Sequence, residues 1–398
     1  MNTDINNNFA KNGLLLTLGN VMFISCLYFY VSPIPNGLDT QPYSILLASL
    51  FVFCAILSGE RVPRHFIFLF LFLFSVAVIS MIGGIFKSGG VEILRGFANY
   101  YAAVIYLIGL HVYFKKYGFP KKLFLLSIAV YIGVGILQLY SPDIVSMLVS
   151  SRTTLDRGVT SLTPEPTFFG IILYLMVLIV YVLPDFEPKK TLIFSMILAI
   201  IFIAKSSMAV VFLLFFLLSV IEPKRVLYLS LVIIPSFLGL ASVSQSMLDD
   251  SSRLFKIVDL LMSMDISAIL MDASINDRVG QVYLSFYGFV DNNLLPGYFN
   301  TYSYYTGNKA SLSDGLFWYG AVSDKVISYW GALFYEIGII SILYIFFLCF
   351  VMMRTKFKRL MFIGLFIPLF GGVTFSNPFV YMLILLFSNN YRRPTWKI

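Results

Sequence analysis

The sequence predicts an all-α polytopic membrane protein that forms a single integral membrane domain over residues 1–398. Apolar residues make up 59% of the chain and the mean hydropathy is +0.86. Charged residues make up only 12%, whereas soluble domains are about one-quarter charged. Apolar runs of about 17 to 25 residues, long enough to cross the hydrocarbon core, recur along the chain, so we expect about twelve transmembrane helices.

The apolar runs give the positions of the expected helices. Those in the first half lie at 13–31, 43–58, 66–86, 95–114, 123–141 and 167–184. Those in the second half lie at 191–205, 207–221, 226–244, 328–350, 360–375 and 378–389. The first run is longer than a signal-peptide core and no small-residue cleavage site follows it, so we expect it to stay as a membrane helix.

Basic residues concentrate in alternate short connections. They are Lys11, Arg61, Arg64, Lys115, Lys116, Lys121, Lys122, Lys189, Lys190, Lys224, Arg225, Arg354, Lys356, Lys358, Arg359, Arg392, Arg393 and Lys397. Because Lys and Arg favour cytoplasmic loops, this pattern predicts that both termini are cytoplasmic, in a bacterial inner membrane. The excess of Lys and Arg in these loops therefore accounts for the formal charge of +8. We expect membrane lipid, not nucleic acid, as a partner.

Two connections on the predicted outer side are too long to be simple links: 142–166 and 245–327. Loops of this length are usually functional. In the larger loop, 253–272 has a helical apolar stripe and 278–290 resembles a second amphipathic segment. Between 291 and 320 the pattern changes to turn residues interleaved with aromatics. We therefore expect a large extracytoplasmic loop that contains short helices.

Metal and cofactor chemistry has little support in the sequence. The cysteines lie inside apolar segments without metal spacing, at Cys26, Cys54 and Cys349. The histidines fall on the predicted cytoplasmic side, at His65 and His111. Asp249 and Asp250 are adjacent but stand without other ligand types. There is no P-loop or Rossmann glycine pattern, so we expect no metal and no cofactor.

The segment 152–170 is the most informative stretch of the chain. Pro164 and Pro166 bracket Glu165 at the mouth of a predicted helix, and prolines restrict their neighbours, so the backbone there is stiff. A carboxylate held rigidly at a membrane mouth suits a polar task, and Arg157 and Glu165 are candidate catalytic residues. The alternative is a simple helix start, with the carboxylate favouring the helix dipole.

Four cations near the predicted outer ends of helices are candidates for binding an anion: Arg95, Arg152, Lys205 and Arg278. Arg95, Arg152 and Lys205 are assigned to binding of a diphosphate or anionic lipid head group, and Arg278 to catalysis. Arginine binds phosphate through a planar fork and stays charged. The alternatives are interfacial anchors that snorkel, for Arg95 and Lys205, and an ordinary solvated arginine for Arg278.

Aromatic residues in the large outer loop are candidate sugar-binding residues: Tyr298, Tyr302, Tyr305 and Trp318. Asparagine amides lie among them, and flat apolar faces beside amides suit sugar rings. Tyrosines at a membrane interface would give the same composition. Glu336, inside the helix after this loop, is a charged residue to which we assign no role.

Three segments carry a resemblance to a known family. They are Thr160–Gly170 (TSLTPEPTFFG), Lys205–Val211 (KSSMAVV) and Ser328–Tyr344 (SYWGALFYEIGIISILY). Together with the layout of helices and the late outer loop, they resemble the Wzy-type O-antigen polymerases of the O-antigen polymerase and ligase superfamily. The resemblance implies a GT-C-like membrane fold.

The resemblance implies a metal-independent glycosyltransferase that joins undecaprenyl-diphosphate-linked oligosaccharide repeat units on the periplasmic face. In this reading Arg157 and Arg278 match the family's outer-loop arginines and Glu165 matches its Glu-Pro acid. The paired Arg and Gly spacing of some polymerases is not clearly present in either loop. A chain-length regulator protein is a further expected partner.

Three alternatives stay open. O-antigen ligases are similar but typically carry a histidine in the large outer loop, and this chain has none there. A lipid-linked oligosaccharide flippase or other transporter would have a similar helix number, but transporters usually place charges near the midplane and have related halves. A scaffold of the polysaccharide machinery would leave the large outer loop without a purpose.

Overall fold

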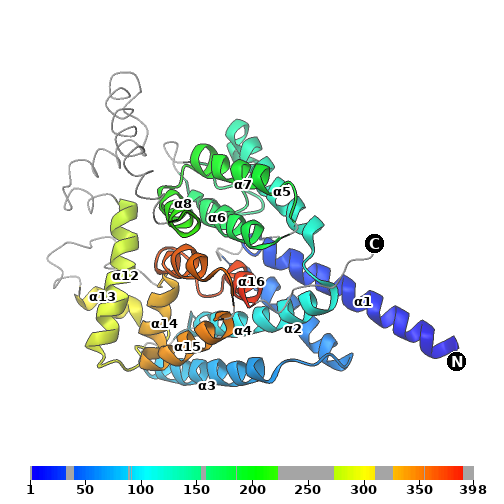
Figure 1. Cartoon of the computed structure of the whole chain (residues 1–398). Coiled ribbons are helices and arrows are strands. Elements are labelled where there is room, and N and C mark those ends of the chain that lie inside the picture. Colours follow the sequence, from blue (N-terminus) through cyan, green and yellow to red (C-terminus); the bar gives the residue numbers. More distant parts are fainter. Residues whose placement is uncertain are drawn as a thin grey trace.

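The computed structural model describes residues 2–32, 40–87, 90, 92–153, 158–184, 186–222, 273–309, 326–353 and 355–388. Within these residues all regular secondary structure is helical and there is no strand, which confirms the predicted all-α class. The helices pack into one bundle, from which the amino-terminal end of α1 projects (Figure 1).

The first part of the chain contains α1 (Asn2–Leu27), α2 (Tyr43–Leu57), α3 (Arg64–Lys87), α4 (Glu92–Tyr117), α5 (Lys121–Tyr140), η1 (Pro142–Val145) and α6 (Pro166–Val182). The middle part contains α7 (Lys189–Leu198), the π-helical turn η2 (Ala199–Ala204), α8 (Ser207–Val220), α12 (Ala273–Asp291) and α13 (Tyr302–Lys309). The last part contains α14 (Tyr329–Ile337), η4 (Gly338–Ile340), α15 (Ser341–Met352), η5 (Leu360–Phe366), η6 (Pro368–Phe370) and α16 (Pro378–Phe387).

Among the described residues, four helices are long and apolar enough to cross a membrane: Arg64–Lys87, Glu92–Tyr117, Lys121–Tyr140 and Tyr329–Met352. Six shorter apolar helices accompany them: Gly13–Leu27, Tyr43–Leu57, Pro166–Val182, Ser207–Val220, Leu360–Phe370 and Pro378–Phe387. These helices lie where apolar runs predicted them. The predicted run 226–244 lies outside the described residues, and the number of about twelve crossings stays a prediction.

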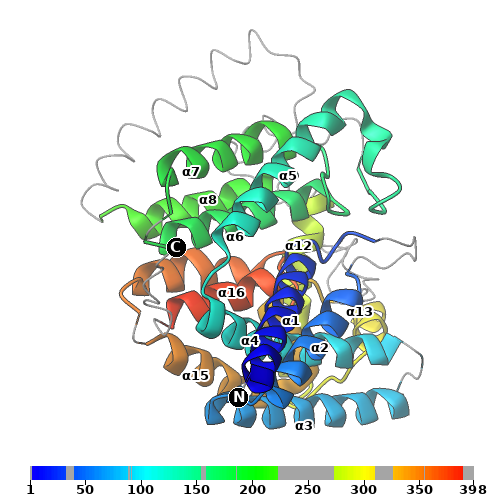
Figure 2. The same cartoon turned by 90° about the vertical axis from the view of Figure 1, so that its right-hand side faces the viewer.

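The bundle has a buried centre and an apolar outer surface. In α6, every residue from Phe168 to Val180 is buried, and α16 contacts both α4 and α6. Figure 2 shows α16 between the group of α6 to α8 and the group of α1 to α4. Outside, Phe86 of α3 is 84% exposed and Phe346 of α15 is 67% exposed. Such an apolar surface is stable against lipid and unfavourable in water.

The basic connections predicted on one side of the membrane meet one another in the structure. Lys116 Nζ lies 2.6 Å from Glu60 Oε1, which joins the end of α4 to the connection after α2. Arg359 Nη1 donates a hydrogen bond of 2.6 Å to the carbonyl of Ile221, which joins the connection before η5 to the end of α8. Four connections of this set are therefore joined in two pairs.

The predicted run 191–205 forms α7 and then the π-helical turn η2. Two further predicted helices are interrupted. The run 328–350 is divided at Gly338, whose φ is +67°, and the structure continues as η4 and α15. The run 360–375 forms the π-helix η5 and the 3₁₀ turn η6 and ends at Phe370. Pro368 cannot donate the backbone hydrogen bond that would continue η5, and Gly372 then takes φ +68°. Both interruptions occur beside the cavity described below.

The large outer loop is helical in part. The predicted amphipathic segment 278–290 lies within α12, whereas 253–272 lies outside the described residues. Turns were predicted from 291 to 320, but Tyr302–Lys309 forms α13. This helix forms because tertiary packing overrides the local pattern: α13 contacts α12, and Tyr302 is only 3% exposed.

Candidate functional site

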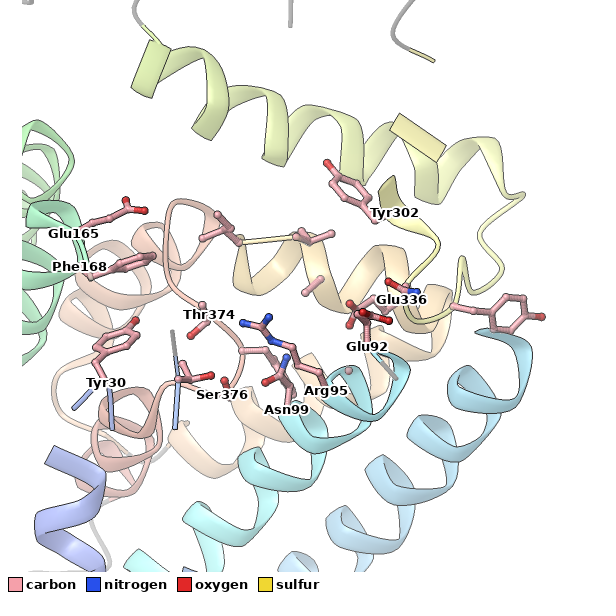
Figure 3. Close-up of a pocket in the computed structure, with 18 of the residues that line it drawn as sticks. Tyr30, Glu92, Arg95, Asn99, Glu165, Phe168, Tyr302, Glu336, Thr374 and Ser376 are labelled. Carbon is pink, nitrogen blue, oxygen red and sulfur yellow. The ribbon is translucent and has the colours of Figure 1, made fainter. Parts of the chain in front are cut away.

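A cavity of about 470 Å³ opens among the connections predicted on the outer side. Its polar lining consists of Thr40, Glu92, Arg95, Asn99, Arg152, Glu165, Asn300, Glu336, Thr374 and Ser376. Its aromatic lining consists of Tyr30, Phe168, Tyr298, Tyr302 and Phe375. In Figure 3, Glu165 and Phe168 lie toward one end of the cavity and Glu92 and Glu336 toward the other. Charged groups therefore converge here in a chain with few charges.

Glu165 is held between two arginines. Arg152 Nη2 lies 3.2 Å from Glu165 Oε1, and Arg278 Nη2 lies 3.3 Å from Glu165 Oε2. The backbone N–H of Arg152 donates a 2.6 Å hydrogen bond to the Pro164 carbonyl, which closes the loop and brings Arg152 beside the carboxylate. Glu165 stands at the start of α6 but its side chain makes no capping hydrogen bond. Its carboxylate therefore forms ion pairs with the two arginines and does not cap the helix.

Arg278 lies behind Glu165 and is buried. It comes from α12 and is 8% exposed, so the alternative of an ordinary solvated arginine is wrong. Its guanidinium carbon lies 5.7 Å from the centre of the Phe168 ring, and its Nε lies 3.9 Å from Asp277 Oδ2. Within the described part of the chain, Nε and Nη1 make no hydrogen bond. Arg278 does not line the cavity; it reaches the site through Glu165 and Phe168.

Arg95 reaches into the cavity from the first turn of α4 (Figure 3). Asn99, one helical turn later, faces the same cavity because residues four apart share a helix face. Arg95 is exposed and forms no ion pair with any residue that the structure describes. A guanidinium free in a cavity is available to an anionic ligand.

The loop between η6 and α16 supplies hydroxyl groups to the same region. Asn377 accepts a 3.0 Å hydrogen bond from the Phe379 N–H and caps α16, and the Tyr381 hydroxyl donates 2.6 Å to the Phe375 carbonyl. These bonds hold the loop so that Thr374 and Ser376 line the cavity. The Thr374 hydroxyl oxygen is buried and, among the described residues, has no hydrogen-bond partner.

The turn after α12 carries two residues of the lining in left-handed backbone conformations. Tyr298 has φ +76° and Asn300 has φ +59°, conformations that cost energy outside glycine and often accompany functional sites. Phe299 between them is fully buried, with its ring 5.3 Å from that of Tyr100. Lys87 Nζ lies 4.7 Å from the centre of the Tyr298 ring. These contacts anchor the strained turn at the cavity wall.

The predicted sugar-binding aromatics divide into two groups. Tyr298 and Tyr302 line the cavity, and burial raises the pKa of the Tyr302 hydroxyl well above its usual value. Tyr305 does not line it: its ring packs 5.7 Å from that of Tyr335. Trp318 lies outside the described residues.

Two of the predicted cations are not part of the cavity lining. Lys205 is exposed, has φ +47°, and joins η2 to α8. Ser206 beside it caps α8 by accepting a 3.3 Å hydrogen bond from the Ala209 N–H. The structure therefore gives Lys205 a place at a helix junction away from the cavity. Arg157 lies outside the described residues.

Several lining residues were not assigned from the sequence. Glu336 is a charged residue inside an apolar helix, and this signal was visible without a role attached to it. Asn99 shares a helix face with Arg95, which the spacing of four residues could have revealed. Thr374 and Ser376 carried no signal, because only the ending of η6 turns their loop toward α4.

Comparison of the chain with protein-family models, curated proteins and solved structures finds no match. Among the described residues, no three His, Cys, Asp or Glu side chains come together in a group that could hold a metal ion.

Proposed function

We propose that this chain is a surface-polysaccharide polymerase of the O-antigen type. It joins undecaprenyl-diphosphate-linked oligosaccharide repeat units on the periplasmic face of a bacterial inner membrane. The observation that carries the proposal is the cavity at the predicted outer ends of the membrane helices, which Arg95, Arg152 and Glu165 all line. Two segments that resemble the family, 160–170 and 328–344, each contribute a carboxylate to this cavity, Glu165 and Glu336.

The arginines fit the chemistry of a diphosphate leaving group. In the reaction, the bond between the donor sugar carbon and the diphosphate oxygen breaks, and its electron pair leaves with the diphosphate. The same carbon bonds to an acceptor hydroxyl oxygen, which loses its proton. Arg95 and Arg152 stabilise the developing negative charge through fixed donors. This role is one that metal ions fill in other enzymes, so the proposed transferase is metal-independent.

The rest of the lining fits a sugar. Tyr298 and Phe168 offer flat apolar faces, and Asn99, Thr374 and Ser376 offer hydrogen-bonding groups. Pockets of about 300–1,000 Å³ enclose molecules of drug size, and the cavity of about 470 Å³ falls in that range. It has room for the reacting sugars and diphosphate, while the rest of each glycan extends outside.

A strain that lacks this gene tests the proposal. Surface polysaccharide and lipid-linked intermediates from the strain are separated on a gel and compared with those of the parent. The proposal expects the ladder to collapse to a single repeat unit on the lipid carrier or core. Full-length polymer that stays on the lipid carrier would instead identify a ligase. Single units that accumulate inside the cell would identify a flippase.

Variants of the same gene then connect the activity to the cavity. Arg278→Ala, and Arg157→Ala in the part of the loop 142–166 that is not described, are expected to abolish polymer, and the amount of each variant in the membrane is measured beside polymer length. Normal chain lengths from both variants would contradict the assignment of these arginines.

A further inference from the structure

Glu336 is a cavity-lining carboxylate with a single described side-chain partner. It belongs to α14, within the candidate membrane span Tyr329–Met352. The Tyr100 side chain is its neighbour, and the Tyr100 hydroxyl donates a 3.4 Å hydrogen bond to the Ala332 carbonyl. Within the described residues, no Lys or Arg forms an ion pair with it. Ionisable residues at membrane depth are costly and usually functional.

Glu336 and Glu165 differ in what their oxygens already contact. Each Glu165 oxygen faces a guanidinium, one from Arg152 and one from Arg278. Glu165 therefore holds the two cations in position, and its charge is shared between them. Glu336 instead has a neutral tyrosine, Tyr100, as its neighbour, and it lines the cavity. Of the two carboxylates, Glu336 has the free acceptor capacity that a general base needs.

The backbone around Glu336 fixes where its carboxylate lies. Ser80 Oγ donates a 2.8 Å hydrogen bond to the Glu336 carbonyl. One residue later α14 ends, and Gly338 takes φ +67° where the helix is interrupted. The Ile339 N–H donates 2.8 Å to the Leu294 carbonyl, and the Gly297 N–H donates 2.7 Å to the Tyr335 carbonyl. The interrupted helix is thus attached to the turn that carries Tyr298 and Asn300, two other residues of the lining.

We propose, on the basis of the function proposed above, that Glu336 is the general base for the acceptor sugar. The Glu336 carboxylate takes the proton of the acceptor hydroxyl as that oxygen bonds to the donor sugar carbon. The electron pair of the broken carbon–oxygen bond leaves with the diphosphate, which Arg95 binds. The acceptor therefore sits at the Glu336 end of the cavity, and Glu165 acts as a positioning residue for Arg152 and Arg278.

The full-length chain in lipid nanodiscs tests this assignment. The probe is the undecaprenyl-diphosphate-linked repeat unit extracted from the deletion strain, used as donor and acceptor, with product length followed on gels. Glu336→Gln keeps the shape of the side chain and removes its basicity. Because general base catalysis contributes about 10²–10⁴-fold, kcat is expected to fall by that factor with KM nearly unchanged. Glu60→Gln, at the opposite end of the bundle, is the matched control and keeps wild-type kcat.

A second variant separates a base from a structural role. Glu336→Ala leaves space at the cavity wall, and added formate supplies a carboxylate that fits it. We expect formate to raise the rate of this variant by roughly tenfold and to leave the wild type unchanged. If Glu336→Gln accumulates poorly, Glu336→Ala with and without formate decides the question.

The outcomes distinguish this inference from the proposed function. A wild-type chain that forms no polymer from the probe overturns the proposed function, and the inference with it. If the wild type is active and kcat of Glu336→Gln stays within about threefold of the wild-type kcat, only the assignment of Glu336 as general base is overturned. A loss of that size is below what general base catalysis supplies. If formate does not raise the rate of Glu336→Ala, the assignment of Glu336 as general base is also overturned.

Discussion

Arg278 Nη2 lies 3.3 Å from Glu165 Oε2, although 113 residues separate them in the chain. This ion pair attaches the first helix of the outer loop that the structure describes, α12, to the start of α6. Both side chains are largely shielded from solvent, with exposed fractions of 9% and 22%. A pair in such surroundings is costly to break, because the remaining partner is left as an uncompensated charge.

Removing Arg278 is therefore expected to affect both stability and activity. Arg278→Ala should lower the free energy of unfolding by about 3–5 kcal/mol, the usual effect of breaking a buried pair. Thermal unfolding in detergent measures the loss of stability, and polymer length measures the loss of activity. Arg61→Ala, at the basic connections of the opposite end, is the control and should match the wild type. In the double variant Arg278→Ala/Glu165→Ala, the losses should be less than additive; additive losses would mean that the pair is not coupled.

Arg152 should behave differently from Arg278, although it contacts the same carboxylate. Its side chain is 51% exposed, so solvent screens the pair and its contribution to stability is at most about 1 kcal/mol. Arg152 also lines the cavity, and its loss should weaken the donor complex. We expect Arg152→Ala to keep its unfolding temperature within a few degrees of the wild type while KM for the lipid-linked donor rises. A large loss of stability with unchanged KM would reverse this assignment.

Arg95 should be sensitive to the shape of its cation. Arginine contacts phosphate oxygens through a planar fork, and lysine presents a compact point charge. Arg95→Lys should therefore retain less than one-tenth of wild-type kcat/KM, about the effect of one lost charge-assisted hydrogen bond. The fold should be unaffected, because Arg95 is exposed and unpaired among the described residues. If Arg95→Lys has the same kcat/KM as the wild type, residue 95 attracts the diphosphate by charge alone and makes no bidentate contact with it.

Gly338 should not tolerate a side chain. Its φ is +67°, and a Cβ built there would lie 2.7 Å from the Leu294 carbonyl oxygen. Gly338→Ala should cost about 1–3 kcal/mol of stability and move Glu336 away from the acceptor. The reference is Gly133→Ala in α5, where a Cβ would meet nothing within 4 Å. That change should raise stability by roughly 0.5–1 kcal/mol, because alanine favours helices. Unfolding midpoints that are equal in the two variants would contradict the close approach at Gly338.

The sequence by itself identified most helices, because lipid acts on each segment locally. A run of apolar residues must satisfy its backbone hydrogen bonds internally, and it can do so only as a helix. Charge in the connections is likewise a local property, and the loops that it assigned to one side meet in contacts such as Lys116 with Glu60. The stiffness of the backbone at Glu165 was also visible, because the prolines on both sides are covalent neighbours.

Only the tertiary structure decided which of these residues share a cavity. Arg278 faces Glu165 because the folded chain brings the start of α12 within side-chain reach of the start of α6, and no local pattern carries the distance between two helices. Glu336 faces the cavity, and Tyr305 does not, because the break at Gly338 and the packing of α13 set the direction of each side chain. Hydropathy and charge act residue by residue, whereas a site depends on contacts among segments far apart in the chain.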